Sequence, residues 1–277
     1  MTAIDLDHEY DNRGRVPEHP VILAGWARDA AEFRRQARGE LQVPYGPGSR
    51  QRLDLFYPSG AVRGAVMFIH GGYWQSLGKD SLSHMAKGLV EPGIAVAMPG
   101  YDLCPQVRVA EIVEQIAAAA VTASRKLQTP MVVAGHSAGG HLAAEMMLRD
   151  WSGLEHEMGF DPFPAAYPVS GLFDLRPLLQ TRVNIALQMD QEEAMRLSPV
   201  LRIPARRKRI LAVVGSAESS EYHRQSSEFC EAWSSGGMEA SCEFVAGANH
   251  FTIIAPLADP ASRMVAQVLD LAAPERS

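Results

Sequence analysis

MVVAGHSAGGHLAAEMML, residues 131–148, joins a short apolar run to a helix-like run through the pentapeptide 135–139. The pentapeptide reads G-H-S-A-G, and a G-x-S-x-G pattern between a strand and a helix is the context of a nucleophile elbow. The serine of such an elbow lies on a sharp turn, and glycines two residues to either side leave room for that turn. The helix that follows directs its first N–H groups toward developing negative charge. We therefore predict that Ser137 is a nucleophile.

The sequence on both sides of this stretch alternates between strand-like and helix-like segments. Strands are predicted at 52–58, 65–70, 94–100, 131–135, 165–171, 208–215 and 241–247. Helices are predicted at 80–90, 108–127, 138–148, 220–233 and 256–272. Short apolar strands that alternate with helices indicate an α/β fold, in which helices cover both faces of a mainly parallel sheet. Ligand sites in such sheets lie at the carboxyl ends of the strands.

Two segments fall outside this alternation. Residues 1–40 read as an N-terminal extension or cap, with a helix at 26–37. Residues 172–204 form a mostly helical insertion that is punctuated by prolines. We expect this insertion to lie over the strand ends, where it can act as a lid. A chain of 277 residues is within the range of one α/β domain, so we predict a single domain.

The composition narrows the class of protein. The chain is 47% hydrophobic with a net charge of −6, which is ordinary for a globular protein and does not favour a nucleic-acid partner. The basic run at 206–209 directly precedes a predicted strand and reads as a solvated turn. Cys104, Cys230 and Cys242 lie too far apart for a zinc motif or a disulfide framework. With no signal-like or membrane-spanning run, we expect a cytoplasmic protein with a small-molecule substrate, and we leave a homodimer open.

A second glycine-containing motif follows the predicted strand 65–70. Residues 70–74 read H-G-G-Y-W, and an HGG turn after this strand supplies an oxyanion donor in many esterases. We expect His70 to hold the loop by hydrogen bonds rather than to carry a proton. Tyr73, Trp74 and Phe251 flank catalytic positions, and we expect them to line the acyl or leaving-group pocket, with core packing as the alternative.

The serine needs a general base, and His250 is the best candidate among nine histidines. It lies just past the last predicted strand, as the order serine, acid, histidine requires. His136 and His141 belong to the elbow and its helix, and are poorly placed to reach the serine hydroxyl. His156 and His223 also follow the serine, but His223 falls in a predicted helix where a surface position is expected.

The acid is expected after the strand 208–215. No aspartate is available there, so the acid is a glutamate, and the loop and helix start that follow contain Glu218 and Glu221. Glu218 lies in the loop and is the preferred candidate. Glu221 begins a helix, where an acidic residue is expected because of the helix dipole alone, and it remains the alternative.

These motifs resemble the α/β-hydrolase type of kynurenine formamidase (arylformamidase) and its bacterial esterase relatives. The resemblance rests on HGGYW at 70–74, GHSAGGHL at 135–142 and VVGSAESSEYHRQS at 213–226. The segment EYDNRGRVPEHPVI at 9–22 is similar to the leader of that family, so the resemblance spans nearly the whole chain.

The resemblance implies an α/β-hydrolase fold and a serine hydrolase that uses no cofactor and no metal. By position, Ser137, Glu218 and His250 match the catalytic triad, with glutamate where the family usually has aspartate. The amides of Gly72 and Ala138 would form the oxyanion hole, supported by Gly71. The implied substrate is an aryl formamide such as N-formyl-kynurenine. The alternatives are a short-acyl carboxylesterase and, from a different class, a non-catalytic binding module on a hydrolase scaffold.

Overall fold

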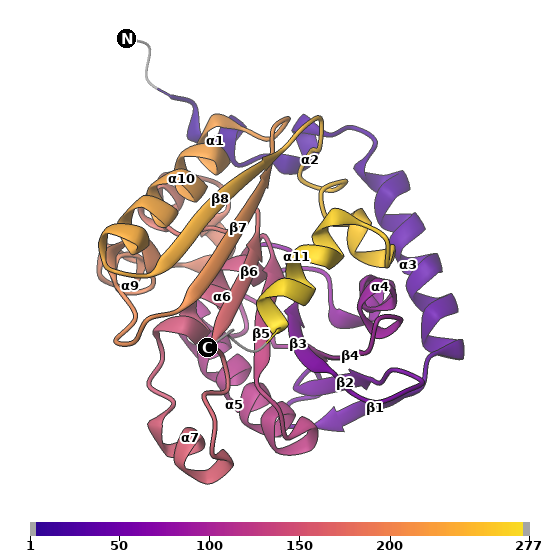
Figure 1. Cartoon of the computed structure of the whole chain (residues 1–277). Helices are drawn as coiled ribbons and strands as arrows, with labels where there is room; N and C mark the ends of the chain where they lie inside the picture. The colour runs from indigo at the N-terminus through magenta and orange to yellow at the C-terminus, as the bar shows by residue number, and fades with distance from the viewer. Residues whose placement is uncertain (1–3, 274–277) are drawn as a thin grey trace.

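A computed structural model describes residues 4–273, and its centre is an eight-stranded sheet in the order β1–β2–β4–β3–β5–β6–β7–β8 (Figure 1). The strands are β1 Gly39–Pro44, β2 Arg52–Phe56, β3 Gly64–Ile69, β4 Ile94–Pro99, β5 Met131–His136, β6 Ala165–Val169, β7 Arg209–Gly215 and β8 Glu239–Val245. The pairs β1·β2 and β2·β4 are antiparallel, and the remaining pairs are parallel. The predicted α/β class with a mainly parallel sheet is confirmed.

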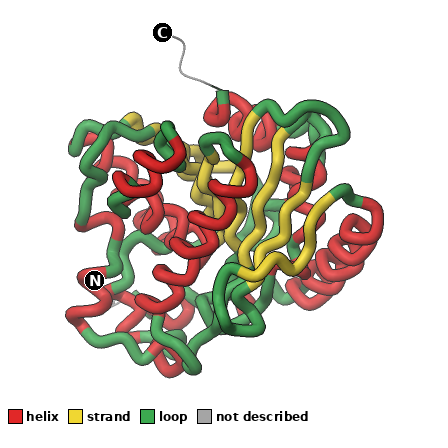
Figure 2. The backbone as a smooth tube through the Cα atoms, turned by 90° about the horizontal axis from the view of Figure 1, so that it is seen from below, coloured by secondary structure: helices red, strands yellow, loops and turns green. Residues whose placement is uncertain are grey.

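Helices cover both faces of this sheet. They are α1 Leu6–Glu9, α2 Asn12–Arg15, α3 His19–Gln36, α4 Lys87–Val90, α5 Val109–Leu127, α6 Ala138–Leu148, α7 Ser152–Met158, α8 Asn184–Leu187, α9 Gln191–Arg196, α10 Ser220–Ser235 and α11 Arg263–Ala272. Figure 2 shows the strands between helices on either side. Helices α5, α6 and α10 pack on one face, and α3, α4 and α11 on the other.

The two-sided cover explains the apolar runs in the sequence. In β3, Met67 belongs to the core under α5 and α6, while its neighbours Val66 and Phe68 belong to the core under α3 and α11. All six residues of β3 are buried, as are all six of β5. A strand that is buried on both faces has no polar face, and therefore its sequence does not alternate.

Several elements differ from the expectation. Strand β1 was not predicted, because it is an exposed edge strand that carries polar residues. The helix expected at 80–90 is instead the 3₁₀ turns η1 Lys79–Ser81 and η2 Ser83–Ala86, followed by the single turn α4. The helix expected at 256–272 begins only at α11, after the turn η5 Ala255–Ala258. Among the helices of residues 4–273, none is long and apolar enough to cross a bilayer.

A buried ion cluster fastens α3 to the sheet. The fully buried carboxylate of Asp54 on β2 accepts hydrogen bonds from Lys79 Nζ at 2.8 Å, from the backbone N–H of Gln42 at 2.8 Å, and from Arg34 of α3. Asp80 contacts the same two cations, with Lys79 Nζ at 2.6 Å, but its side chain is 62% exposed. Loss of the buried carboxylate therefore leaves the buried Lys79 with only an exposed anionic partner.

We predict that Asp54→Ala lowers the free energy of unfolding by about 3–5 kcal/mol, because Lys79 stays buried beside the cavity left by the carboxylate. The matched change Asp80→Ala, which removes an exposed partner of the same cations, should cost about 1 kcal/mol or less. Urea unfolding of both variants measures the difference. Equal losses would show that burial of Asp54 is not what makes the cluster strong.

Candidate active site

Ser137 lies between β5 and α6 in a strained backbone conformation, with φ 57° and ψ −120°. The turn is tight enough that side chains are excluded around it. A Cβ on Gly135 would lie 2.1 Å from the carbonyl oxygen of Gly139, and a Cβ on Gly139 would lie 2.0 Å from the carbonyl oxygen of Ile69. The glycines of the pentapeptide are thus required by contact of backbone with backbone, and the serine projects at the carboxyl edge of the sheet.

The HGG loop lies directly against this turn. A Cβ on Gly71 would approach the carbonyl oxygen of His136 to 2.6 Å and the Cβ of Ser137 to 3.0 Å. Gly72 has a φ of +106°, which favours glycine, and its Cβ would lie 2.2 Å from the carbonyl oxygen of Ser76. The structure therefore brings the backbone of Gly71 and Gly72 beside Ser137. Ala138 is the first residue of α6, where an N–H has no partner within its own helix.

Buried side chains support the loop from below. Tyr101 Oη donates a hydrogen bond to the carbonyl oxygen of His70 at 2.9 Å, and the two rings stack with centroids 4.1 Å apart. His70 Nδ1 lies 2.8 Å from the carbonyl oxygen of Gly71, so the imidazole is engaged within its own loop. This is the holding position that was expected for His70.

Glu218 and His250 form a short hydrogen bond beside the elbow. Glu218 Oε2 lies 2.6 Å from His250 Nδ1, and both residues are buried. The other carboxylate oxygen of Glu218 accepts from Ser170 Oγ at 2.6 Å and from the Gly215 N–H at 2.8 Å. A carboxylate that is held on both oxygens can fix the orientation and tautomer of the imidazole. The imidazole then presents its other nitrogen away from the carboxylate.

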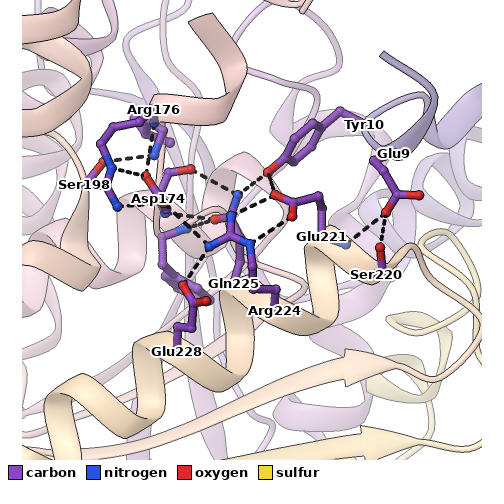
Figure 3. A network of polar contacts seen from close by, with 12 residues as sticks. Glu9, Tyr10, Asp174, Arg176, Ser198, Ser220, Glu221, Arg224, Gln225 and Glu228 are labelled. Atoms are coloured by element: carbon purple, nitrogen blue, oxygen red, sulfur yellow. Dashed lines mark hydrogen bonds and ion pairs between the residues drawn. The ribbon is translucent and has the colours of Figure 1, made fainter. Parts of the chain in front are cut away.

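Glu221, the alternative acid, belongs to a different network (Figure 3). Its carboxylate accepts two hydrogen bonds from Arg224, at 2.7 and 2.8 Å, and one from Tyr10 Oη at 2.7 Å. Burial raises the pKa of Glu221, but the hydrogen bonds from Arg224 and Tyr10 outweigh burial, and the pKa lies below its usual value. The structure therefore places Glu218, and not Glu221, at His250.

The same network attaches the N-terminal segment to α10. Glu9 accepts from Ser220 Oγ at 2.6 Å and from the Glu221 N–H at 3.0 Å. Gln225 Nε2 donates to Tyr10 Oη at 2.7 Å (Figure 3). Residues more than 200 positions apart in the chain thus lie side by side at the edge of the site.

A cavity of about 520 Å³ opens over Ser137 and His250. It is lined by Asp7, Tyr10, Asp11, Asn12, Arg13, Leu23, Trp26, Gly72, Tyr73, Gln75, Ser76, Leu77, His136, Ser137, Arg182, Val183, His250 and Phe251. Seven of these residues come from the segment 1–40, and Arg182 and Val183 come from the segment 172–204. Both segments that were expected to cover the strand ends therefore contribute walls to the cavity.

Of the three aromatic residues expected in the pocket, Tyr73 and Phe251 line the cavity and Trp74 does not. Trp74 is fully buried and packs edge to face on His141, with ring centroids 5.0 Å apart. The expectation for Trp74 is therefore corrected. The chain turns sharply after Gly72, and of two adjacent aromatic side chains one faces the cavity and the other faces the core.

Sequence reasoning missed residues that the fold brings to the site around Glu218 and His250. Tyr222 was quoted within a motif but given no role, and its ring lies 4.7 Å from that of His250. Ser170 and Asn12 were not singled out at all. Their contacts depend on strands and segments that are distant in the chain, so no local spacing signals them.

Residues 66–254 match a family described as the alpha/beta hydrolase fold. The chain belongs to the α/β-hydrolase family. A kynurenine formamidase of Danio rerio is 35% identical to this hydrolase over 231 residues, covering 79% of this chain and 77% of the relative. A kynurenine formamidase of Drosophila melanogaster is 29% identical, over 76% and 74% of the two chains. The resemblance drawn from the motifs is confirmed.

Solved structures agree on the fold of this hydrolase. A protein of Silicibacter sp. TM1040, whose crystal structure is described as that of a candidate thioesterase, is 39% identical with a TM-score of 0.88 and covers 96% of this chain and 100% of its own. Esterase B of Lactobacillus rhamnosis has a TM-score of 0.68 at 18% identity, over 93% of each chain, which shows the fold alone.

Three buried histidines surround the elbow of this hydrolase and remain neutral. Burial lowers the pKa of His70 to about 4 and that of His141 to about 3. Burial, together with the neighbouring His250, holds the pKa of His136 well below its usual range. His136 Nε2 lies 2.8 Å from the carbonyl oxygen of His250, so a neutral His136 helps to hold the backbone of His250.

The depressed pKa of His141 predicts acid sensitivity. At pH values between the unfolded pKa of about 6.5 and the lower folded pKa, only the unfolded chain takes up the proton. The free energy of unfolding therefore decreases by about 1.4 kcal/mol for each unit by which the pH is lowered. His141→Asn has no imidazole at this position, so its stability does not decrease for this reason as the pH is lowered. The difference in free energy of unfolding between the wild type and His141→Asn should therefore shrink by about 2 kcal/mol between neutral pH and about pH 5. Urea unfolding at the two pH values measures the change.

The exposed His156 of α7 provides the control. His156→Asn measures the effect of the same substitution at an exposed position, and the pH dependence found for His141→Asn is compared with it. If the difference in free energy of unfolding between the wild type and His141→Asn does not depend on pH, the buried imidazole is not neutral in the folded state.

Proposed function

We propose that this hydrolase cleaves aryl formamides of the N-formyl-kynurenine type through an acyl-enzyme on Ser137. The observation that carries the proposal is the 2.6 Å hydrogen bond between Glu218 and His250 beside the strained turn of Ser137. An acid that orients a base next to a serine on an elbow is the arrangement for nucleophilic acyl transfer.

In the proposed first half-reaction, Ser137 Oγ attacks the formyl carbon while His250 accepts the hydroxyl proton. Negative charge develops on the carbonyl oxygen, where the N–H groups of Gly72 and Ala138 stabilise it. His250 then gives the proton to the leaving nitrogen, the C–N bond breaks, and the arylamine departs. Glu218 keeps the imidazole oriented and stabilises its cationic form.

In the second half-reaction, a water molecule attacks the formyl ester of Ser137. His250 takes a proton from the water and returns it to Ser137 Oγ, and formate is released. Every proton transfer in the proposed cycle uses side chains of this chain and water.

Two further observations support the substrate class. The formyl group is very small, and the cavity beside Ser137 is bounded by the aromatic Tyr73 and Phe251, which suit a compact acyl group with an aryl leaving group. The curated relatives from Danio rerio and Drosophila melanogaster carry the name kynurenine formamidase. An aniline leaving group also makes the amide easier to cleave than an alkyl amide.

The competing candidate is a hydrolase of short-acyl esters or thioesters, which the description of the Silicibacter relative favours. A comparison of kcat/KM for N-formyl-kynurenine, p-nitrophenyl acetate, p-nitrophenyl butyrate and a short acyl thioester separates the two. We predict the highest value for N-formyl-kynurenine, the type of substrate that the names of the curated relatives indicate. A higher value for butyrate or for the thioester would assign the enzyme to that substrate class, and no turnover of any substrate would favour a binding module.

The acid of the triad gives a second prediction. Glu218→Gln should lower kcat by roughly 10²–10⁴ and leave KM nearly unchanged, because the amide cannot stabilise the imidazolium or fix its tautomer. Glu221→Gln, a matched change three residues away, should cost less than about tenfold, since that carboxylate binds Arg224 and Tyr10. Steady-state kinetics of the two variants would refute the assignment if their effects were reversed.

A further inference from the structure

The charged residues that line the active-site cavity come only from the two segments that cover the strand ends. Asp7, Asp11 and Arg13 belong to the N-terminal segment, and Arg182 belongs to the other. Within residues 4–273, the sheet and the loops that follow its strands contribute no aspartate, glutamate, lysine or arginine to the lining. The cavity therefore has an uncharged, partly aromatic wall near the serine and a charged wall at its cover.

Two of these four charges neutralise each other, and two do not. Asp7 Oδ1 accepts the backbone N–H of Arg182 at 2.7 Å, and Asp7 Oδ2 lies 3.4 Å from Arg182 Nε. In the described part of the chain, no carboxylate lies within ion-pair distance of Arg13, and no cationic side chain lies within that distance of Asp11. Asp11 accepts the Gly14 N–H at 2.9 Å through one oxygen. One cation and one anion of the cavity wall thus have no counter-charge.

The residue between these two charges is fastened to the catalytic loop. Asn12 is buried, and its Nδ2 donates hydrogen bonds to Tyr222 Oη at 2.8 Å and to Tyr73 Oη at 3.3 Å. Tyr73 directly follows the glycines of the HGG loop, and its hydroxyl donates to the carbonyl oxygen of Tyr10 at 2.8 Å. The residues on either side of Asn12 are therefore held in position beside the catalytic loop, while their own side chains are exposed at the cavity.

We propose that Arg13 and Asp11 bind a zwitterionic α-amino acid group on the substrate, with Arg13 on the carboxylate and Asp11 on the ammonium. The proposal rests on the proposed function and assigns the residues that recognise the end of the substrate remote from the scissile bond. N-formyl-kynurenine has this form, because the carbon next to its formamide carbon on the ring carries a chain that ends in an ammonium and a carboxylate. The ring then lies along Tyr73 and Phe251, and the amino acid reaches the charged wall.

The balance of charge favours a zwitterion over a simple anion. The four charged residues of the lining sum to zero, so a ligand with a carboxylate alone meets two aspartates as well as two arginines. A ligand that carries both charges can pair with Arg13 and Asp11 at once. The planar guanidinium of arginine matches a carboxylate through two parallel hydrogen bonds. The cavity volume of about 520 Å³ is within the range of sites for ligands larger than a bare formanilide.

The test measures kcat and KM of Arg13→Gln on N-formyl-kynurenine and on formanilide, which keeps the scissile group and the ring but has no amino acid. For N-formyl-kynurenine we expect KM to rise roughly 5- to 50-fold and kcat to change less than about threefold, because this contact is made equally in the ground state and the transition state. Both constants for formanilide should change less than about twofold, which also shows that the variant is folded.

Two further variants serve as comparisons. Arg13→Lys keeps the charge but not the planar fork, so its KM for N-formyl-kynurenine should lie between those of the wild type and Arg13→Gln. Arg28→Gln removes an exposed guanidinium of α3 that pairs with Asp29 outside the cavity, and it should leave both substrates unchanged.

Two analogues of N-formyl-kynurenine test the two charges separately, one with a primary carboxamide in place of the carboxylate and one without the amino group. Wild-type enzyme should prefer N-formyl-kynurenine to each of them in kcat/KM. Arg13→Gln should remove the preference over the carboxamide. Asp11→Asn, which keeps an oxygen for the Gly14 N–H, should remove the preference over the analogue without the amino group. Each variant deletes one side of one ion pair.

Equal changes of KM for N-formyl-kynurenine and formanilide in Arg13→Gln, or a wild-type enzyme that does not distinguish N-formyl-kynurenine from its carboxamide, would overturn the proposal and leave the formamidase assignment standing. If wild-type enzyme cleaves neither N-formyl-kynurenine nor formanilide, the proposed function itself fails, and this inference fails with it.

Discussion

The backbone of Ser137 is held at a positive φ of 57°, which a residue with a side chain adopts only when its surroundings impose it. β5 imposes it from one side, because that strand is held between β3 and β6 by parallel pairing with both. Helix α6 imposes it from the other, packed so closely that Gly139 leaves no room for a Cβ beside Ile69. The strain is what lifts the hydroxyl above the carboxyl edge of the sheet. At that edge the loops after β7 and β8 deliver Glu218 and His250, and the HGG loop after β3 lies against the turn.

The walls of the site come from chain segments outside the sheet. The N-terminal residues 7–13 are fastened to α10 through Tyr10, Glu221 and Gln225, and five residues of this N-terminal stretch line the cavity over the serine. The reacting groups and much of the cavity lining therefore come from two different parts of the structure. The parallel sheet fixes the reacting groups, while the N-terminal segment and residues 172–204 supply much of the cavity lining. The hydrogen bond from Asn12 to Tyr222, whose ring packs against that of His250, links the two parts.

What the sequence could reveal depended on how local each signal was. The elbow, the HGG loop and the alternation of strands with helices are set by neighbours in the chain, and the structure contains all three. The sequence favoured Glu218 because it lies in the loop and Glu221 begins a helix. The contacts of Glu221 with the distant Tyr10 and with Arg224, which hold it away from His250, became visible only in the structure. The adjacent Tyr73 and Trp74 could not be told apart either, because a turn after Gly72 decides which ring faces the cavity. Strand β1 could not be predicted because it has no apolar pattern. The contact between Asn12 and Tyr222 could not be predicted because the two residues are about 210 positions apart in the chain.

Covalent labelling tests the central claim, that Ser137 is the activated nucleophile, most directly. A fluorophosphonate reacts with a serine whose proton is taken by an oriented histidine, and peptide mass spectrometry locates the adduct. We expect one adduct, on the peptide that contains Ser137, with loss of activity in proportion to labelling and no adduct in Ser137→Ala. Labelling of another residue that parallels the loss of activity, or a wild-type enzyme that cleaves its substrate and yet resists the reagent, would contradict it.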